Sequence, residues 1–333
     1  MKLPISEVQA LVSAALQRAG ANPAMAEATA QALVLAEAQG LGSHGLSRVG
    51  QYSTHLRNGR ANVAAVPRVL HHTGAALVVD ADEGLAFAAC TLAVTEAIAA
   101  ARTHGIAVAG VVRSHHCGVV VDHLRAVAAA GMVGLGFANS PAAMPAAGGK
   151  HPIFGTNPVA AVFPRRGQDP LMIDLSLSEV ARGKVMVAAK KGEAIPLGWA
   201  LDADGQATTD AQAALAGSML PVGAATSTKG AMLALVVELL VTALIGGRYG
   251  FEASSFFVDE GNRPGIGQAF IVIDPGALAG SHSFFDRIEV LLAEMQRDDG
   301  VRLPGARREA LRRRAEAEGL EVADTLLAAW RSD

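Results

Sequence analysis

The sequence predicts an α/β fold in which a central sheet is flanked by helices from both ends of the chain. Strand and helix patterns alternate between about 69 and 273, whereas the first 60 residues and the segment 283–331 carry helical patterns only. Hydrophobic residues make up 51% of the 333 residues, enough for a sizeable core. We therefore expect residues 1–70 to pack with the helices of 283–333, and residues 71–282 to form the central α/β region.

Three helices are expected in the N-terminal region. Ser6 can cap the first helix, and Pro23 fits the first turn of the second. The third helix follows the corner Gly42–Gly45 and ends near Asn58. His44 therefore lies at a helix start, where free backbone N–H groups favour anions.

The central region alternates strands and helices. Strands are expected at about 69–70, 76–79, 106–112, 133–137, 158–163, 171–173 and 269–273. Helices are expected at about 84–104, 123–130, 178–191 and 228–246. The segment 192–228 is polar and contains Gly and Thr, so we predict a long connection, a feature that usually serves a function in compact domains.

The helix at 228–246 is apolar all round apart from Glu238 and Thr242. It must therefore be buried on several sides, either as the central helix of a large core or with one face against another subunit. Its apolar stretch, Met232–Ile245, falls short of the ~20 residues that a membrane span needs.

Composition limits the partners and the compartment. A net charge of −3 argues against a nucleic-acid-binding protein, which needs a concentrated basic face. The two cysteines, Cys90 and Cys117, do not form the paired framework of a secreted protein, and no signal sequence is recognisable. We expect a soluble, cytoplasmic protein that binds neither membranes nor nucleic acid.

The first candidate site lies at the Gly42–Gly45 corner. His44 precedes Arg48 by four residues, so the two side chains share a helix face, and Ser43 adds a hydroxyl beside them. A guanidinium together with a titratable imidazole suits a substrate carboxylate and a proton transfer. A capping Ser with an exposed His and a surface Arg would explain the same residues.

The second candidate site follows the predicted buried strand 106–112. Residues 114–117, with the sequence Ser-His-His-Cys, occupy the loop beyond its carboxyl end, where α/β proteins bind ligands. Metal binding by His115 and His116 is a rival interpretation, but no third ligand stands at regular spacing, so we expect no metal site. Cys117 is interpreted as a small buried residue rather than a nucleophile.

Polar turns at the ends of three later strands could hold a substrate or a phosphate. They are Asn139-Ser140, Gly155-Thr156-Asn157-Pro158, and Asp174-Leu175-Ser176-Leu177-Ser178 with Lys184 beyond. Hydroxyls and a lysine at a helix start suit a phosphate, although an ordinary capped helix explains them nearly as well. No Gly-x-Gly-x-x-Gly occurs, so a dinucleotide would need an architecture other than the Rossmann fold.

A basic run near the C-terminus allows two interpretations. Its residues are Arg307-Arg308 and Arg312-Arg313-Arg314. They form either a solvated helix face or an anion-binding site.

Taken together, these motifs resemble the type-2 malate/L-lactate dehydrogenase family over nearly the whole chain. The matching segments are Ser43-His44-Gly45 with Arg48, Ser114-His115-His116 with Gly118, Asn139-Ser140, Gly155-Thr156-Asn157-Pro158, Asp174–Ser178 with Gly183-Lys184, Gly205 with Thr208-Thr209-Asp210, Lys229-Gly230 with Val237–Leu240, Ile273-Asp274-Pro275, and Arg302–Gly305 with Arg308. Their order and spacing carry the resemblance.

The resemblance implies a mixed-sheet, non-Rossmann core like that of sulfolactate dehydrogenases, which binds NAD or NADP and works as a homodimer. The implied catalytic residues are Ser43, His44, Arg48 and His116, and the implied substrate-binding residues are Arg48, His115 and Ser140. The implied cofactor residues are Thr156, Asn157, Asp174, Leu175, Ser176, Ser178, Lys184, Lys229, Gly305, Arg307 and Arg308.

Family members reduce small 2-oxo acids to 2-hydroxy acids, or cyclic 2-imino acids such as piperideine- and pyrroline-2-carboxylate. We expect hydride transfer to C2, with His44 or His116 supplying the proton and Arg48 binding the carboxylate. The segment 222–230 is longer than its family counterpart, so a catalytically silent relative that binds small acids is a second interpretation. A metal-dependent hydrolase, based on the adjacent histidines alone, is a third.

Overall fold

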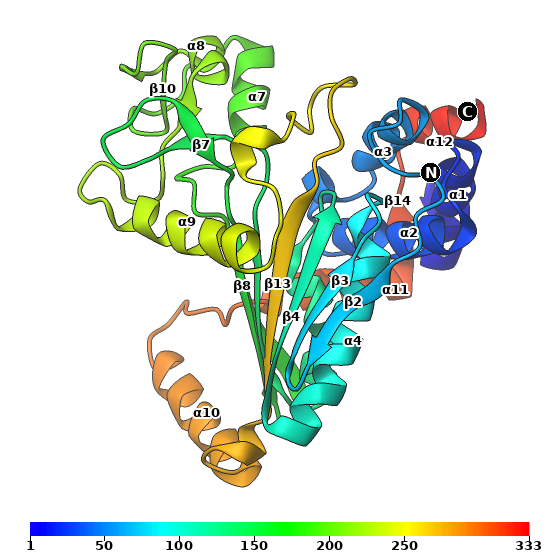
Figure 1. Cartoon of the computed structure of the whole chain (residues 1–333), viewed down its shortest axis with the longest axis vertical. Helices are drawn as coiled ribbons and strands as arrows, with labels where there is room; N and C mark the ends of the chain where they lie inside the picture. The colour runs from blue at the N-terminus through cyan, green and yellow to red at the C-terminus, as the bar shows by residue number, and fades with distance from the viewer. Residues whose placement is uncertain (333) are drawn as a thin grey trace.

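Seven strands form a mixed sheet at the centre of the molecule (Figure 1). The computed structural model describes residues 1–332, with the side chains of residues 1–330. In sheet order the strands are β2 (Arg68–Thr73), β3 (Ala76–Asp80), β4 (Ile106–Ser114), β13 (Ile266–Ile273), β5 (Val133–Ala138), β8 (Val159–Arg165) and β9 (Gln168–Leu175). Strands β3 and β4 pair in parallel, and the other neighbours in this sheet are antiparallel. The predicted α/β class with a mixed sheet is confirmed.

Helix α4 (Ala86–His104) joins the two parallel strands and packs against the sheet. Alanines on its buried face, including Ala89, Ala93 and Ala97, are fully inaccessible and let the helix approach β4 and β13 closely. By length and composition α4 is the one helix in residues 1–332 apolar enough to cross a membrane, and half of its apolar window is buried inside the protein. The predicted cytoplasmic location stays a prediction.

Helices from both ends of the chain share one core. The N-terminal helices are α1 (Ile5–Arg18), α2 (Pro23–Ala38) and α3 (Arg48–Arg57), and the C-terminal ones are α11 (Ala306–Glu318) and α12 (Asp324–Ser332). Strand β1 (Lys2–Leu3) pairs with β14 (Leu320–Glu321), and Trp330 is buried in the same core. Helix α10 (Ser281–Met295), in contrast, packs against β8 at the far end of the sheet (Figure 1).

The predicted connection 192–228 is wrong as an unstructured link, because much of it belongs to a small lobe. The lobe contains α7 (Arg182–Lys191), α8 (Ala211–Ala216), β10 (Ala200–Leu201), β11 (Ala207–Thr208) and β12 (Ser218–Met219). Its core includes Val185, Ile195 and Ala211. Strands of two residues leave no periodic pattern and therefore could not be predicted from the sequence.

Some predicted boundaries also differ. The helix expected at 123–130 is two short helices, α5 (Val120–His123) and α6 (Arg125–Ala129), and the helix expected at 178–191 begins only at Arg182. Besides the lobe strands β10–β12, the short strands β1, β14, β6 (Met144–Pro145) and β7 (Pro152–Phe154) were not predicted.

The apolar segment 228–246 forms α9 (Lys229–Leu239), which continues into a π-helical segment, η2 (Leu240–Leu244). One face is buried, but the opposite face carries exposed Met232, Leu233, Leu235, Val236, Leu239 and Leu244. The interpretation as the central helix of a large core is therefore wrong for this chain on its own.

The buried carboxylate of Glu238 joins three loops behind α9. Its Oε1 accepts hydrogen bonds from Asn139 Nδ2 (3.1 Å) and from the backbone N–H of Gly250 (2.8 Å), and its Oε2 accepts one from Asn157 Nδ2 (2.8 Å). Burial raises the pKa of Glu238 above its ordinary value, although the three hydrogen-bond donors act in the opposite direction. The carboxylate thus fixes the ends of β5, β8 and the segment after η2 relative to α9.

We expect Glu238→Ala to lower the free energy of unfolding by about 2–4 kcal/mol, because buried donors lose their acceptor. Urea unfolding monitored by circular dichroism measures the change. Glu294→Ala, at a carboxylate that is 67% exposed, is the control and should have little effect. Equal stability of the Glu238 and Glu294 variants would contradict this role.

Candidate active site

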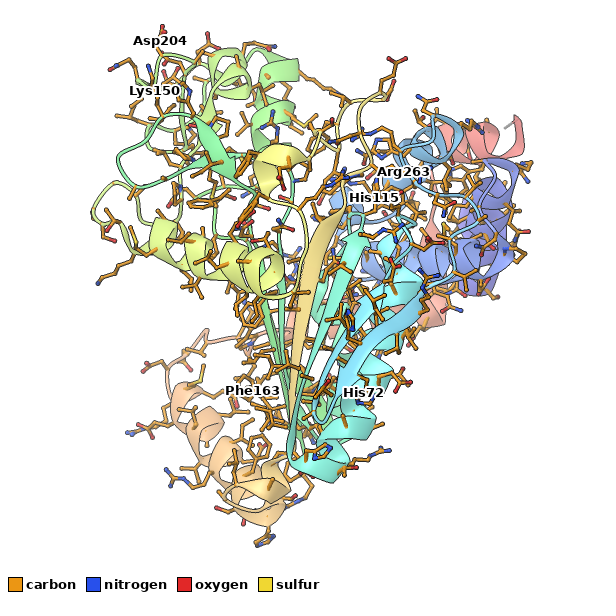
Figure 2. The ribbon with its side chains drawn as sticks, viewed as in Figure 1. His72, His115, Lys150, Phe163, Asp204 and Arg263 are labelled. Atoms are coloured by element: carbon orange, nitrogen blue, oxygen red, sulfur yellow. The ribbon has the colours of Figure 1, made fainter. Side chains whose placement is uncertain are left out.

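The two histidine loops meet at one end of the sheet. His44 ends a 3-10 turn, η1 (Gly42–His44), and His116 follows β4. Their ring centroids are 5.6 Å apart. The helix face predicted to be shared by His44 and Arg48 is wrong, because α3 begins only at Arg48 and a turn separates the two residues. Figure 2 shows the neighbouring His115 at the end of the sheet opposite Phe163, in the region where the N-terminal helices approach the strands.

Tyr52 connects α3 to the second loop. Its hydroxyl lies 2.6 Å from His116 Nδ1. Burial raises the pKa of Tyr52, so the group is a neutral phenol. Tyr52 was not among the predicted site residues, although its position four residues after Arg48 places both on one face of α3.

Arg48 presents a cation without a carboxylate partner. Its Nε donates to the carbonyl of Ser43 (2.7 Å) and its Nη1 donates to Oε1 of Gln51 (2.6 Å). In the described part of the chain it forms no ion pair, and its remaining N–H groups are free to bind a planar anion. The predicted role as a carboxylate-binding residue fits this geometry.

The two imidazoles beside Arg48 are neutral at neutral pH. Burial, then the charges of Arg48 and Arg308, lowers the pKa of His44 to about 4. Burial, then Arg48 and His44, lowers the pKa of His116 well below its ordinary value. Ser43 Oγ lies 3.0 Å from His44 Nδ1, and neither Nε2 has a hydrogen-bond partner among the described residues. Each ring can therefore accept a proton from a ligand.

His115 lies behind this pair. Its Nε2 is 3.0 Å from Nδ1 of His55, its ring packs against Phe256 with centroids 5.2 Å apart, and the residue is 1% exposed. The direct substrate contact expected for His115 therefore conflicts with its burial, because the ring has no open side.

Two residues at neighbouring strand ends differ in accessibility. Ser140 is partly exposed, and its Oγ accepts from the backbone N–H of Thr156 (3.1 Å). Gly155 permits this close approach, since a Cβ there would lie 2.5 Å from the backbone N of Ser140. Asn157 is 0% exposed and its amide faces Glu238, so the direct cofactor contact expected for it conflicts with its position.

A cavity of about 290 Å³ opens between the end of α2 and the start of α11. It is lined by Gln39, Gly40, Leu41, Arg302, Leu303, Gly305, Arg307 and Arg308. Gly305, with φ of 89°, lets α11 begin against β9, because a Cβ there would lie 2.9 Å from Cβ of Met172. The cavity thus collects Arg302 and two arginines of the basic run, Arg307 and Arg308, for which a solvated face or an anion site was predicted.

Arg308 has a buried Nη1 without a hydrogen-bond partner. The nearest acid, Asp174, is 4.0 Å away, and its Oδ2 accepts from the backbone N–H of Val121 (3.0 Å). Burial raises the pKa of Asp174 to about 6. A guanidinium N–H without a hydrogen-bond partner, on a residue that lines a cavity, suits a phosphate oxygen as acceptor.

The other predicted cofactor residues lie on two adjoining segments. Ser178 forms a β-bridge with Pro221, and the N–H of Val222 donates to the carbonyl of Leu177 (2.8 Å). This pairing brings 174–184 beside 222–229. Leu175, Lys184 and Lys229 are exposed and Ser176 is partly exposed, whereas Ser178 is buried and its Oγ donates to the carbonyl of Val180 (2.8 Å).

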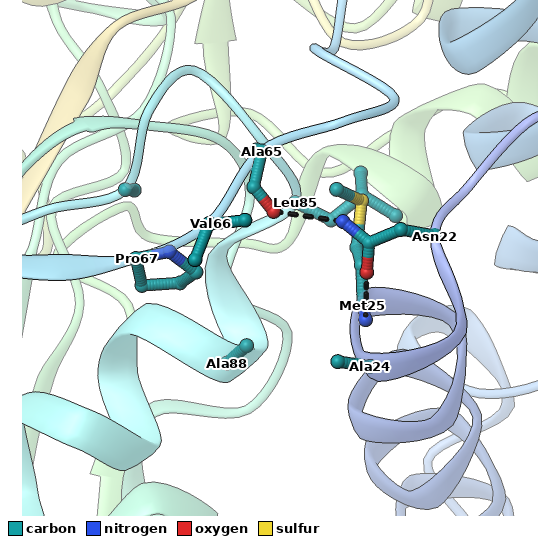
Figure 3. Close-up of a pocket in the computed structure, with 9 residues that line it drawn as sticks. Asn22, Ala24, Met25, Ala65, Val66, Pro67, Leu85 and Ala88 are labelled. Carbon is teal, nitrogen blue, oxygen red and sulfur yellow. Dashed lines mark hydrogen bonds between the residues drawn. The ribbon is translucent and has the colours of Figure 1, made fainter.

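Neither of the two rival interpretations, a metal site and a cysteine nucleophile, gains support. Within residues 1–332 no group of three or more His, Cys, Asp or Glu is arranged to hold a metal ion. Burial raises the pKa of Cys117 to about 12, so its thiol is not poised as a nucleophile. A second, apolar recess of about 60 Å³ between α2 and α4 (Figure 3) contains Met25, Pro67 and Leu85 and carries no titratable group.

Comparison with known proteins agrees with this arrangement. The model of the malate/L-lactate dehydrogenase family matches residues 3–330. The chain belongs to this family. It is 47% identical over 325 residues to a (2R)-3-sulfolactate dehydrogenase (NADP(+)) of Chromohalobacter salexigens, covering 98% of this chain and 96% of the relative.

Two further relatives are reductases. A Δ1-pyrroline-2-carboxylate/Δ1-piperideine-2-carboxylate reductase of Pseudomonas putida is 36% identical, with 97% of this chain and 94% of the relative covered. The crystal structure of a Δ1-piperideine-2-carboxylate reductase from Pseudomonas syringae superposes with a TM-score of 0.93 at 33% identity, covering 100% of this chain and 99% of the other. The predicted family, fold and enzyme class, an NAD(P)-dependent oxidoreductase, are confirmed.

Proposed function

We propose that this chain catalyses hydride transfer between NAD(P) and C2 of a small acid, interconverting a 2-oxo acid and a 2-hydroxy acid. The observation that carries the proposal is the unpaired Arg48 guanidinium beside the neutral rings of His44 and His116. Because the 47% identical relative is a (2R)-3-sulfolactate dehydrogenase, 3-sulfolactate and 3-sulfopyruvate are the first substrates to test.

Arg48 positions the substrate in this proposal. Its Nη1 and Nη2 would donate two parallel hydrogen bonds to the C1 carboxylate, as guanidinium and carboxylate geometry favours. Its Nε already binds the backbone of Ser43, so the guanidinium plane is fixed before a ligand arrives. Binding therefore costs little side-chain entropy.

A histidine moves the proton. When a 2-hydroxy acid is oxidised, the free Nε2 of His44 or His116 takes the proton from the hydroxyl group at C2. When a 2-oxo acid is reduced, the protonated ring returns it to the carbonyl oxygen. The bound nicotinamide supplies the hydride in the reduction and takes it in the oxidation. Since both rings are neutral in the free protein, they are ready as bases for oxidation.

Reduction of a cyclic 2-imino acid is the second candidate. It is favoured by the two reductases among the relatives, and Arg48 would bind its carboxylate in the same way. An imine nitrogen can arrive already protonated, so this reaction would depend less on His44 and His116. The catalytically silent interpretation based on 222–230 stays open to a test of NAD(P)H binding.

We expect NADPH or NADH oxidation with 3-sulfopyruvate, pyruvate or oxaloacetate, and a weaker or absent reaction with the cyclic imines. Because the free histidines have low pKa values, kcat/KM for oxo-acid reduction should rise about tenfold for each unit by which the pH falls between about 8 and 5.

His44→Gln and His116→Gln show which ring transfers the proton, with a loss of about 10²–10⁴-fold in kcat for that ring. His282→Gln, at an exposed ring, is the control. Normal turnover in both variants would exclude the proton role.

We propose that Arg308 binds a cofactor phosphate, which its buried, unpartnered Nη1 and the adjoining cavity support. Arg308→Met should weaken NADPH binding about tenfold or more, the value of a charge-assisted hydrogen bond. Fluorescence titration with NADPH and NADH measures this, and Arg314→Met, an exposed residue of the same helix, is the control. Equal affinity of the Arg308 variant and the wild type would refute the assignment.

We also propose that the exposed apolar face of α9 is covered by a second copy of the chain in a homodimer. Six large apolar side chains on one face are more than an isolated surface helix usually shows. Leu233→Glu with Val236→Glu should convert a dimer to a monomer in light scattering coupled to size exclusion. Val187→Glu, on an exposed part of α7, should leave the mass unchanged. A wild-type monomer at micromolar concentration would contradict the proposal.

A further inference from the structure

Residues 253–263, which we name the strap, connect η3 (Gly250–Glu252) with the strand β13. The strap lies over α3 and closes on itself, since the N–H of Ser254 donates to Asn262 Oδ1 (2.9 Å) and the N–H of Asn262 donates to Ser254 Oγ (3.1 Å). It therefore has a defined shape although it contains no helix or strand.

The buried side chain of Arg60 binds the backbone of the strap. The residue is 1% exposed, and its guanidinium donates to the carbonyls of Ser254 (3.1 Å), Asn262 (3.3 Å) and Val258. It forms no ion pair within the described residues, so backbone carbonyls of the strap are the main acceptors for a buried cation. Such a fork of donors is a property of arginine that lysine cannot reproduce.

Further bonds fasten the strap to α3 and to the residues that follow it. Asn58 Nδ2 donates to the carbonyl of Asp259 (3.1 Å), and Arg263 Nε donates to the carbonyl of Gly59 (2.9 Å). Figure 2 shows Arg263 close to the histidine end of the sheet. All these contacts join residues about 200 positions apart in the chain.

The strap brings two aromatic rings to the candidate active site. The guanidinium carbon of Arg48 lies 5.1 Å from the ring centroid of Phe257, and the Phe256 ring lies 5.1 Å from that of His116. Gln51 joins the two sides, because it accepts from Arg48 and donates to the carbonyl of Phe256. Phe257 thus covers one face of the carboxylate-binding cation and leaves its edge open.

We propose that Phe257 is a specificity-determining residue for the small acid, and that Arg60 is the positioning residue that holds it there. The inference rests on the function proposed above. A ring over Arg48 orients the guanidinium and occupies space beside it, so the site selects acids whose substituent at C3 is no larger than a sulfonate group. Phe257 is 42% exposed, which makes it replaceable without loss of the core.

Two variants of Phe257 test the first part. Phe257→Ala should raise KM for the small acid roughly two- to thirtyfold, the range of a cation–π contact, with a smaller change in kcat. It should also raise kcat/KM for phenylpyruvate, whose C3 substituent is larger than a sulfonate group, relative to pyruvate about tenfold, because space beside Arg48 opens. Phe257→Tyr retains the ring, so its KM should match that of the wild type. Unchanged KM and unchanged selectivity in Phe257→Ala would overturn the assignment.

Variants of Arg60 test the second part with a measurement that needs no substrate. In Arg60→Met and Arg60→Lys, cleavage by Glu-C protease after Asp259 or Glu260 should be faster, as followed by mass spectrometry. KM should rise as in Phe257→Ala, whereas the affinity for NADPH should stay unchanged. Arg102→Met, at an exposed arginine of α4, is the control. Guanidinium ion, far below denaturing concentration, should lower the KM of Arg60→Ala.

The outcomes separate the two proposals. If wild-type protein turns over no 2-oxo acid or cyclic imine with either cofactor, the proposed function fails and the specificity role fails with it, while the protease still reports whether Arg60 holds the strap. If wild-type protein is active but Arg60→Met matches the control in cleavage and in KM, the positioning role of Arg60 is overturned.

Discussion

The insertion of β13 between β4 and β5 is the constraint on which the rest of the structure depends. Gln268–Ile273 hydrogen-bond to both neighbours, so a strand from late in the chain completes a sheet begun nearly 200 residues earlier. The segment leading into β13 must therefore cross the end of the sheet where β4 and β5 also finish. Antiparallel pairing gives this arrangement, in contrast to the all-parallel order of Rossmann folds, and it brings the strap over α3.

Electrostatics explains why this end of the sheet is suited to an acid. Arg48 and Arg308 lie close enough to His44 that both lower its pKa, and neither is neutralised by a hydrogen-bonded carboxylate. Arg308 has only a long ion pair, 4.0 Å from Asp174, and partly buried cations with so little compensation are costly unless an anion binds them. In the function proposed here, a substrate carboxylate at Arg48 and a cofactor phosphate at Arg308 would be those anions. The low pKa of the ring follows first from its burial and then from these two cations.

Much of the architecture could be predicted because it depends on local patterns. Apolar runs such as 106–112 and the alanine-rich helix at 84–104 carry their period in the sequence, and the motif order identified the family. The lobe could not be predicted, because its strands are only two residues long and β12 is held by non-local packing of Met219 with Met144 and Leu177. Likewise, the exposed face of α9 could not be foreseen, since an all-apolar helix gives no direction of burial.

The sequence by itself determined which chemical groups this protein has and roughly where each stands along the chain: two histidine loops, an arginine four residues beyond the first, and polar turns at strand ends. Only the tertiary structure decided their accessibility and partners. It buried His115 and Asn157, paired Tyr52 with His116, and laid Phe257 over Arg48. The reason is that these contacts join segments about 60 to 210 residues apart, and packing, not local pattern, sets them.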